Sequence, residues 1–434
     1  MPRDADPIDA ALRIGHALCA DALWWDGRCT FTTDDIASTP EGWRTVHQTC
    51  GGDLYAGTAG IALFLARLSA VTGERVIART AAGAIAHALA EAEAAEMARC
   101  SALFVGRIGI AVAAAMAGAW LDRPAALDAA RVLARQLASE GVGGFSGSDL
   151  MAGWAGGIAG ALVLARRLED DQLIGWASDL GDALVGAAQV SATGWHWPAR
   201  DEPVGLCGLS HGAAGIAWAL AELAAATGAK RFAEAAAGAV AYEQHWFDAV
   251  ARNWPDLSPE SRDAGGRRSC SMSWCHGAPG IALTRLRLWA LTGSEAMRAQ
   301  AMVALATTAD CLRANLANHS GNYSLCHGLA GNAEALLQGG TLFDTAGLAE
   351  EIAASGIRRF GQAPRSWPAG VDSSGAMSPT LMLGLAGTAY FLLRVNDPGG
   401  TPSILLPDCA MPGDVVPVLV QAFAGEDAAL AGCV

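Results

Sequence analysis

A pair of glycines separated by two residues recurs seven times along the 434-residue chain, at intervals of about fifty residues. The pairs are Gly57–Gly60, Gly106–Gly109, Gly153–Gly156, Gly212–Gly215, Gly277–Gly280, Gly328–Gly331 and Gly384–Gly387. Each pair opens an apolar run, such as Ile61–Ala66, and a more charged run follows, such as Glu74–Arg79. An interval of this length accommodates two helices with their loops. The repeat therefore predicts seven helical hairpins, each with a buried first helix and an amphipathic second helix.

Buried first helices and amphipathic second helices favour two concentric rings, so we predict an all-α fold, an α/α toroid of seven hairpins. The composition agrees, because only 4 tyrosines are present and runs of β-branched residues are scarce. The uninterrupted repeat predicts one domain over residues 1–406. Residues 407–434 are then a short C-terminal extension with one apolar stretch, Val415–Phe423. Glycines at the helix starts let the backbones crowd at one end of the barrel and aim free N–H groups there.

The overall composition excludes several classes of protein. Hydrophobic residues make up 52% of the chain, but glycines interrupt the longest uncharged runs, which favours inner helices over transmembrane segments. The first residues show no apolar signal segment, so we expect a cytoplasmic protein. Without export, the eleven cysteines are expected to be free thiols or metal ligands. A net charge of −14 with no basic stripe argues against nucleic-acid binding.

Two Cys-His pairs occupy the same register in successive repeats. Cys275-His276 precedes Gly277 and Cys326-His327 precedes Gly328, and His211 holds the histidine register before Gly212. Thiolate and imidazole ligands are those that tetrahedral zinc prefers. The spacing predicts a site with three or four ligands from the two pairs, with His211 as a further candidate. Three protein ligands would leave an open position, as catalytic zinc requires. The alternative is that each cysteine is a small buried hydrophobe and each histidine a satisfied core residue.

Two carboxylates share another register. Asp53 and Asp149 each lie four residues before a first glycine, so we expect both at the barrel end that carries the Cys-His pairs. The longest interval, between Gly212 and Gly277, contains an excursion from Trp246 and then a polar loop. That loop is either a cover for the site or an ordinary surface loop.

At these residues the chain resembles the lanthionine synthetase C-like (LanC-like) cyclase family. The resemblance is carried by the segments Asp53–Gly57, Gly208–Ile216, Trp274–Ile281, Leu325–Asn332 and Leu383–Gly387. Within that family, the chain most resembles the cyclase domain at the C-terminal end of bifunctional class II lanthipeptide synthetases, on the basis of Asn253–Leu257 and Pro402–Leu406.

The resemblance implies roles for particular residues. Cys275, Cys326 and His327 would bind one zinc ion, His211 would be the acid–base histidine, and Asp149 would support it. His276 stands where class I cyclases have a tyrosine, so it is a further catalytic candidate. Ser271 stands where those cyclases have an arginine, and Arg267 and Arg268 are nearby in the sequence. The identity of a second acid beside the zinc site therefore stays open.

The implied reaction joins a cysteine thiolate of a dehydrated precursor peptide to a dehydroalanine or dehydrobutyrine of the same peptide. The product is a lanthionine or methyllanthionine thioether. The dehydratase domain that precedes the cyclase in class II synthetases is absent from this chain, so the resemblance implies a separate dehydratase as partner.

Three other readings stay open at this point. The same site would serve addition of an external thiol, such as glutathione, to dehydrated peptides. Protein prenyltransferases also combine an α/α toroid with a zinc-activated thiol, although the Cys-His-Gly motifs speak against them. A non-catalytic scaffold that binds a precursor peptide or a dehydratase is the third possibility, and the intact set of ligand residues argues against it.

Overall fold

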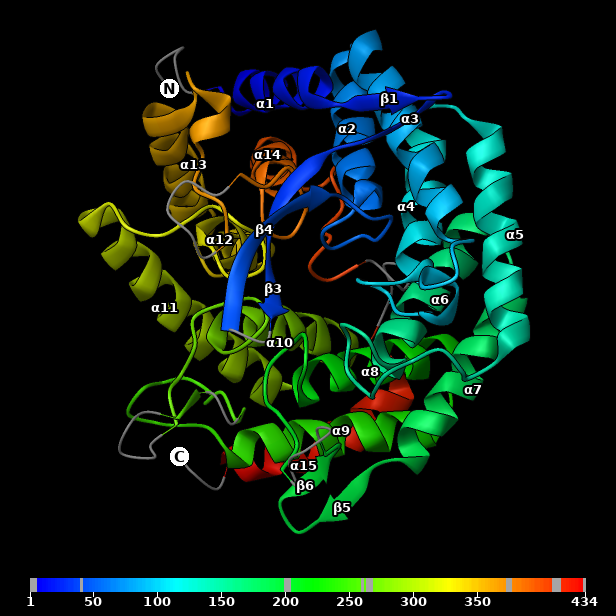
Figure 1. Ribbon diagram of the computed structural model, residues 1–434. Helices are drawn as coiled ribbons and strands as arrows, with labels where there is room; N and C mark the ends of the chain where they lie inside the picture. The colour runs from blue at the N-terminus through cyan, green and yellow to red at the C-terminus, as the bar shows by residue number, and fades with distance from the viewer. Residues whose placement is uncertain are drawn as a thin grey trace.

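The computed structural model describes residues 6–39, 42–198, 204–258, 261–262, 268–371, 377–407 and 415–431. Over these residues the chain is mainly helical, and its helices form an inner and an outer ring around a common axis (Figure 1). The predicted all-α double-ring toroid is confirmed. None of the described helices is both long enough and apolar enough to cross a membrane.

The inner ring consists of helices that begin immediately after the first glycine of each pair. They are α2 (Thr58–Thr72), α4 (Arg107–Trp120), α6 (Trp154–Leu168), α8 (Ala213–Thr227), α10 (Ala278–Thr292), α12 (Leu329–Gly339) and α14 (Leu385–Asn396). The second glycine is required by close packing: a Cβ on Gly109 would overlap the carbonyl oxygen of Leu103. All seven helices therefore present their N-termini, and the loops before them, at one end of the barrel (the loop end).

The outer ring is amphipathic, as expected. It contains α3 (Arg75–Glu91), α5 (Pro124–Glu140), α7 (Gln172–Gly186), α9 (Lys230–His245), α11 (Glu295–Asn318) and α13 (Ala346–Phe360). The seventh outer helix is α1 (Pro7–Asp21), which packs against α14 (Figure 1). The two ends of the repeat thus form the last hairpin together and close the ring, an arrangement that the spacing of the glycine pairs does not reveal.

Within the described ranges, three short antiparallel hairpins interrupt the helices, although the composition had made a sheet unlikely. They are β1 (Leu23–Trp25) with β2 (Arg28–Thr30), β3 (Thr32–Thr39) with β4 (Gly42–Thr49), and β5 (Gln189–Ser191) with β6 (Gly194–His196). In Figure 1 the β3–β4 hairpin lies across the centre of the ring. Its Asp34 amide donates to the carbonyl of Met377, in the segment that leads into α14 (3.0 Å).

Smaller elements complete the described chain. Single 3₁₀ turns are η2 (Met97–Arg99), η4 (Gly340–Leu342) and η5 (Pro364–Ser366). The C-terminal extension forms α15 (Pro417–Ala431), which packs across α9 and α10 (Figure 1). Its Asp427 accepts from the hydroxyl of Ser294 (2.7 Å) and the amide of Ala296 (2.9 Å), so α15 helps to cap the start of α11.

A buried ion pair ties the rings together next to the loop end. Arg285 of α10 and Glu243 of α9 are both 0% exposed, and their Nη2 and Oε2 atoms lie 2.8 Å apart. The other oxygen of Glu243 accepts from the amide of Gly208, also at 2.8 Å. Gly208 has φ +105°, which strongly favours glycine. This contact fixes the loop that leads into α8 and carries His211.

Candidate functional site

His211 and Asp149 face each other at the loop end, although 62 residues separate them. The loop before α6 carries Asp149 and the loop before α8 carries His211. Asp149 Oδ1 accepts from the amide of Ala152 (2.8 Å), which closes the turn, and Oδ2 lies 2.8 Å from His211 Nδ1. The carboxylate is thus fixed by its own turn, and it fixes the imidazole with Nε2 left to face other groups.

Electrostatics around His211 favour its charged form. Burial on its own lowers the pKa of His211, but the hydrogen bond and negative charge of Asp149 more than offset this. Cys275 and Asp256 add to the same effect, and the pKa is raised above the ordinary value for imidazole. His211 therefore stays protonated to a higher pH than a free histidine, which suits it to donate a proton near neutral pH.

The predicted thiols also meet. Cys275 is half-buried, Cys326 is buried, and a hydrogen bond joins their sulfur atoms. This bond and the nearby imidazoles of His276 and His327 lower the pKa of Cys275, whereas the bond and burial raise the pKa of Cys326. The hydroxyl of Ser273, 3.2 Å from Cys275 Sγ, supports the same thiolate. The pair thus shares one proton: Cys275 has thiolate character, and Cys326 is the thiol that donates to it.

His327 is oriented by the main chain. Its Nε2 lies 2.8 Å from the carbonyl oxygen of Gly370. Because a carbonyl only accepts, Nε2 carries the proton and Nδ1 keeps its lone pair. A backbone carbonyl in this role is the usual partner of a metal-binding histidine. The imidazole is also close enough to Cys275 to influence its pKa.

The donor set fits zinc in its chemistry. Among the described residues, no group of three or more His, Cys, Asp or Glu side chains is arranged to hold a metal ion as it stands. The two sulfurs are joined by a hydrogen bond, and the third candidate donor, His327, is held by the carbonyl of Gly370 and is close enough to Cys275 to lower its pKa. Two thiolates and one neutral imidazole are ligands that zinc prefers, and three of them leave one position for a substrate.

His276 contacts His211 and Asp256. Its ring stacks on that of His211, with centroids 5.7 Å apart and planes at 27°. Its Nδ1 is buried, has no hydrogen-bond partner among the residues that the structure describes, and lies 3.8 Å from Oδ1 of Asp256. Four residues therefore form two His–Asp pairs around one stack: Asp149, His211, His276 and Asp256.

Sequence reasoning missed Asp256 as a site residue. It belongs to the segment Asn253–Leu257, which was noted only as a family resemblance. Ser271 brings no charge: its carbonyl accepts from Asn253 Nδ2 (3.1 Å). Arg268 lies over the ring of Trp246 (4.8 Å from Cζ to the centroid), and Arg267 is outside the described residues.

Tyr55 is the second residue that was missed. It lies two residues after Asp53 in the first repeat and forms a hydrogen bond to Cys326. Burial, and then the negative charge of Cys326, raise the pKa of Tyr55, so it remains a hydroxyl that donates to sulfur. Asp53 itself accepts from the amide of Ala56 (2.7 Å), which is the same turn that Asp149 forms. The shared register of the two aspartates is thus a shared turn, and only Asp149 has a histidine opposite.

A cavity of about 420 Å³ opens beside His211 and Asp149. Trp197, Pro198 and Leu206 form apolar parts of its lining, and the start of α8 forms another. The indole of Trp197 is held by a hydrogen bond from Nε1 to the carbonyl of Leu184 (2.7 Å). A peptide-sized ligand therefore has access to the His211–Asp149 pair.

The fold and site define an α/α toroid with paired thiols and paired His–Asp groups at its loop end. The sequence profile of the family described as "Lanthionine synthetase C-like protein" matches residues 49–406, and the chain belongs to this family. Among solved structures, nisin cyclase superposes with a TM-score of 0.58 at 18% identity, over 86% of this chain and 93% of that one. At this identity the likeness speaks to the fold. No curated protein matches the chain significantly.

Proposed function

We propose that this protein is a zinc-dependent lanthipeptide cyclase. It would form lanthionine or methyllanthionine rings in a dehydrated precursor peptide, by adding a cysteine thiolate to a dehydroalanine or dehydrobutyrine. The observation that carries the proposal is the convergence of the Cys275–Cys326 pair, His327 and the His211–Asp149 pair at one end of the toroid. Membership of the LanC-like family supports it.

Cys275, Cys326 and His327 would hold the zinc ion. Bound zinc would supply acidity, so that a peptide thiol at the open position loses its proton at neutral pH. The two protein thiolates already donate negative charge to the ion, and a substrate thiolate would keep more of its nucleophilicity than on a histidine-rich site. Tyr55 and Ser273 would limit this charge by donating hydrogen bonds to the protein sulfurs.

The remaining residues would handle the proton. Addition forms the S–C bond at the β-carbon and moves the electrons of the C=C bond onto the α-carbon and its carbonyl oxygen. The α-carbon must then gain one proton, so the overall reaction consumes only the thiol and the alkene. His211 is the proposed donor, because Asp149 holds its ring and its raised pKa keeps it charged. His276, stacked on it, is placed to stabilise the developing oxyanion or to relay the proton.

The cavity beside His211 suggests where the peptide enters. The loops before α6 and α8 contribute to its lining, and its apolar walls would exclude water from the dehydro residue. A dehydrated peptide requires a dehydratase, which we propose as a cytoplasmic partner. Addition of an external thiol such as glutathione uses the same groups and is the alternative activity.

A cyclisation assay tests the proposal. A synthetic peptide with one cysteine and one dehydroalanine is incubated with the protein, and free thiol is counted by alkylation and mass spectrometry. We expect the wild type and the Cys311→Ala control to consume the thiol without a change in peptide mass, and Cys326→Ala to leave it free. A thiol that persists with folded, zinc-loaded wild type would contradict the proposal. A mass gain of one glutathione, when that thiol is present, would favour the alternative.

A further inference from the structure

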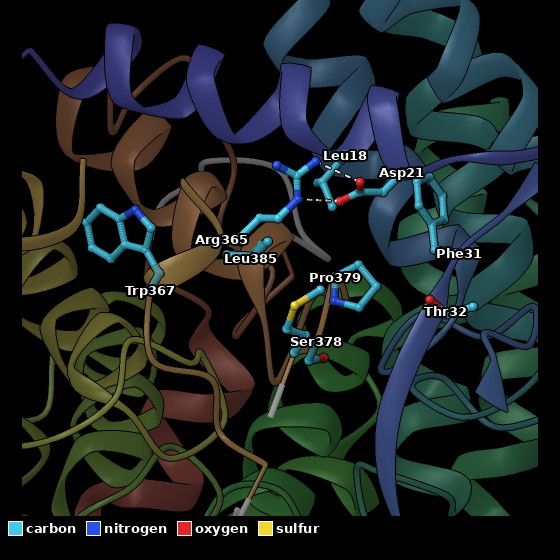
Figure 2. A pocket seen from close by; sticks show the side chains of 10 residues that line it. Leu18, Asp21, Phe31, Thr32, Arg365, Trp367, Ser378, Pro379 and Leu385 are labelled. Atoms are coloured by element: carbon cyan, nitrogen blue, oxygen red, sulfur yellow. Dashed lines mark hydrogen bonds and ion pairs between the residues drawn. The ribbon is translucent and has the colours of Figure 1, made fainter. Parts of the chain in front are cut away.

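A second cavity, of about 210 Å³, lies at the loop end next to the start of α14 (Figure 2). We refer to it as the Trp367 pocket. Six of the residues that line it are Leu18, Asp21, Phe31, Arg365, Trp367 and Leu385. They come from α1, from the chain between β2 and β3, from η5 and the residue after it, and from α14. None of them belongs to the thiol cluster or to the His–Asp pairs.

Trp367 is held rigidly and has one unused donor. Its indole is 4% exposed and contacts the rings of Tyr323 and Phe360, with centroids 4.9 and 5.5 Å away. The six-membered ring packs so closely on Gly356 of α13 that a Cβ there would overlap it. The pyrrole edge carries Nε1, which has no hydrogen-bond partner among the described residues. Figure 2 shows this edge facing the side of the pocket on which Arg365 and Leu385 lie.

An orphaned buried N–H indicates a missing acceptor, because burial without a partner costs free energy that a ligand can recover. Arg365 adds a second donor. Its Nε and Nη2 bind the carboxylate of Asp21 at 2.9 and 2.7 Å, while no bond to Nη1 is found in the described part of the chain. Because Asp21 neutralises the guanidinium, the pocket favours an uncharged acceptor over a free carboxylate. Apolar walls with one neutral donor and one charge-compensated guanidinium match an apolar residue of a peptide and its main-chain carbonyl.

The pocket adjoins the thiol site through one short segment. Trp367 lines the pocket, and the carbonyl of Gly370, three residues later, holds His327. Three residues span at most roughly 11 Å. The amide of Gly370 donates to the carbonyl of Leu383 (2.7 Å), which ties this segment to the loop before α14. A peptide with one residue in the pocket therefore reaches the thiols with about three to five extended residues.

We infer that the Trp367 pocket binds an apolar residue of the precursor peptide, with Nε1 of Trp367 donating to a peptide carbonyl. The pocket would position the cysteine or the dehydro residue a few residues away. This inference rests on the proposed function for the identity of the peptide as substrate. The claim that the pocket binds an apolar side chain and a carbonyl acceptor rests on the pocket alone.

Binding of unreactive peptides tests the inference. Labelled probes carry leucine four residues before or after a cysteine, with glycine and serine between, and serine in place of the dehydro residue. Matched probes carry alanine instead of leucine, and fluorescence anisotropy gives both affinities. We expect the wild type to bind one leucine orientation about tenfold more tightly than its alanine match. Equal affinities in both orientations would overturn the inference.

Two test variants, each paired with a control variant, separate binding from a structural role. Trp367→Phe removes the donor and keeps a ring, so we expect about three- to tenfold weaker binding of the leucine probe. Its melting temperature should not fall through loss of a hydrogen bond, since none is made within the described chain. Trp289→Phe is the control and should bind as wild type.

Thr32→Trp at the rim should abolish the leucine preference, and Val190→Trp on β5 should leave it. Lower stability of Trp367→Phe with an unchanged leucine preference would contradict the inference.

A separate assay distinguishes failure of the inference from failure of the proposed function. A five-residue peptide of one cysteine, one dehydroalanine and otherwise only glycine has no apolar side chain for the pocket, so its cyclisation reports on the thiol site alone. Cyclisation without a leucine preference overturns only the pocket. A leucine preference without cyclisation overturns the proposed function and leaves the pocket as a peptide site.

Discussion

The two Cys-His pairs have the same sequence and the same place in their repeats, but their histidines differ in role. His327 turns to the carbonyl of Gly370, which leaves Nδ1 bare beside the thiols. His276 turns the other way, stacks on His211, and brings its Nδ1 to within 3.8 Å of Asp256. We propose that His327 is the zinc ligand and that His276 belongs to the acid–base group.

The repeat therefore determines the backbone position of each side chain, and the residues that contact the side chain determine its role. Asp53 and Asp149 show the same relation. Both close the same turn with an amide three residues on, at 2.7 and 2.8 Å, but only Asp149 has an imidazole within reach. A difference in role between equivalent positions is thus the feature most open to experiment.

Replacing the two histidines gives the largest expected contrast. His327→Ala should lose zinc and cyclisation to below detection, because a two-thiol site lacks its third ligand. His276→Ala should keep zinc and slow cyclisation. Metal analysis and single-turnover cyclisation measure both variants. Loss of zinc from His276→Ala, with retention in His327→Ala, would reverse the assignment.

His211→Ala is expected to have the next largest effect on the reaction. Loss of a positioned acid slows proton transfer by about 10²- to 10⁴-fold, and zinc should remain bound. Single-turnover cyclisation of the short peptide gives the rate. A variant within a factor of about two of wild type would show that another group protonates the α-carbon.

Asp149→Asn should change the pH dependence. The protonated form of His211 is the proposed acid, so activity is present below its raised pKa and is lost as the pH rises through it. Asparagine removes the charge that raises the pKa and leaves burial, which lowers it, so the loss of activity should move to lower pH. Cyclisation rates measured between about pH 5 and 9 locate the pH at which activity is lost. Asp53→Asn, at the equivalent position, should leave that pH unchanged.

Asp256→Asn is expected to have the smallest effect. Its carboxylate faces His276 at 3.8 Å without a hydrogen bond, so removing the charge should slow cyclisation by about two- to tenfold. Zinc content and melting temperature should match the wild type. No change in rate across the pH range would place the His276–Asp256 pair outside the reaction.

The sequence predicted the toroid because the glycine pairs repeat and the apolar runs follow them. It did not predict that α1 pairs with α14, since closure joins the two ends of the repeat and leaves no periodic signal. The β3–β4 hairpin was also missed, because composition averages out eight-residue strands.

For the site, the register brought Cys275, Cys326, His327, His211 and Asp149 to the loop end, and the structure places all five there. The zinc ion and the roles of these residues stay predictions. Tyr55 and Asp256 could not be assigned from spacing. Tyr55 forms its hydrogen bond to Cys326 from a different repeat, and Asp256 lies in an insertion with no equivalent in the repeat. Such contacts depend on how the ring closes, which no local pattern encodes.

The most direct test of the central claim is the zinc content of the purified protein, measured by mass spectrometry beside Cys326→Ala and Cys311→Ala. The account predicts about one zinc per chain in the wild type and in Cys311→Ala, and almost none in Cys326→Ala. A wild type that is folded, monodisperse and free of zinc after expression in zinc-supplemented medium would contradict it.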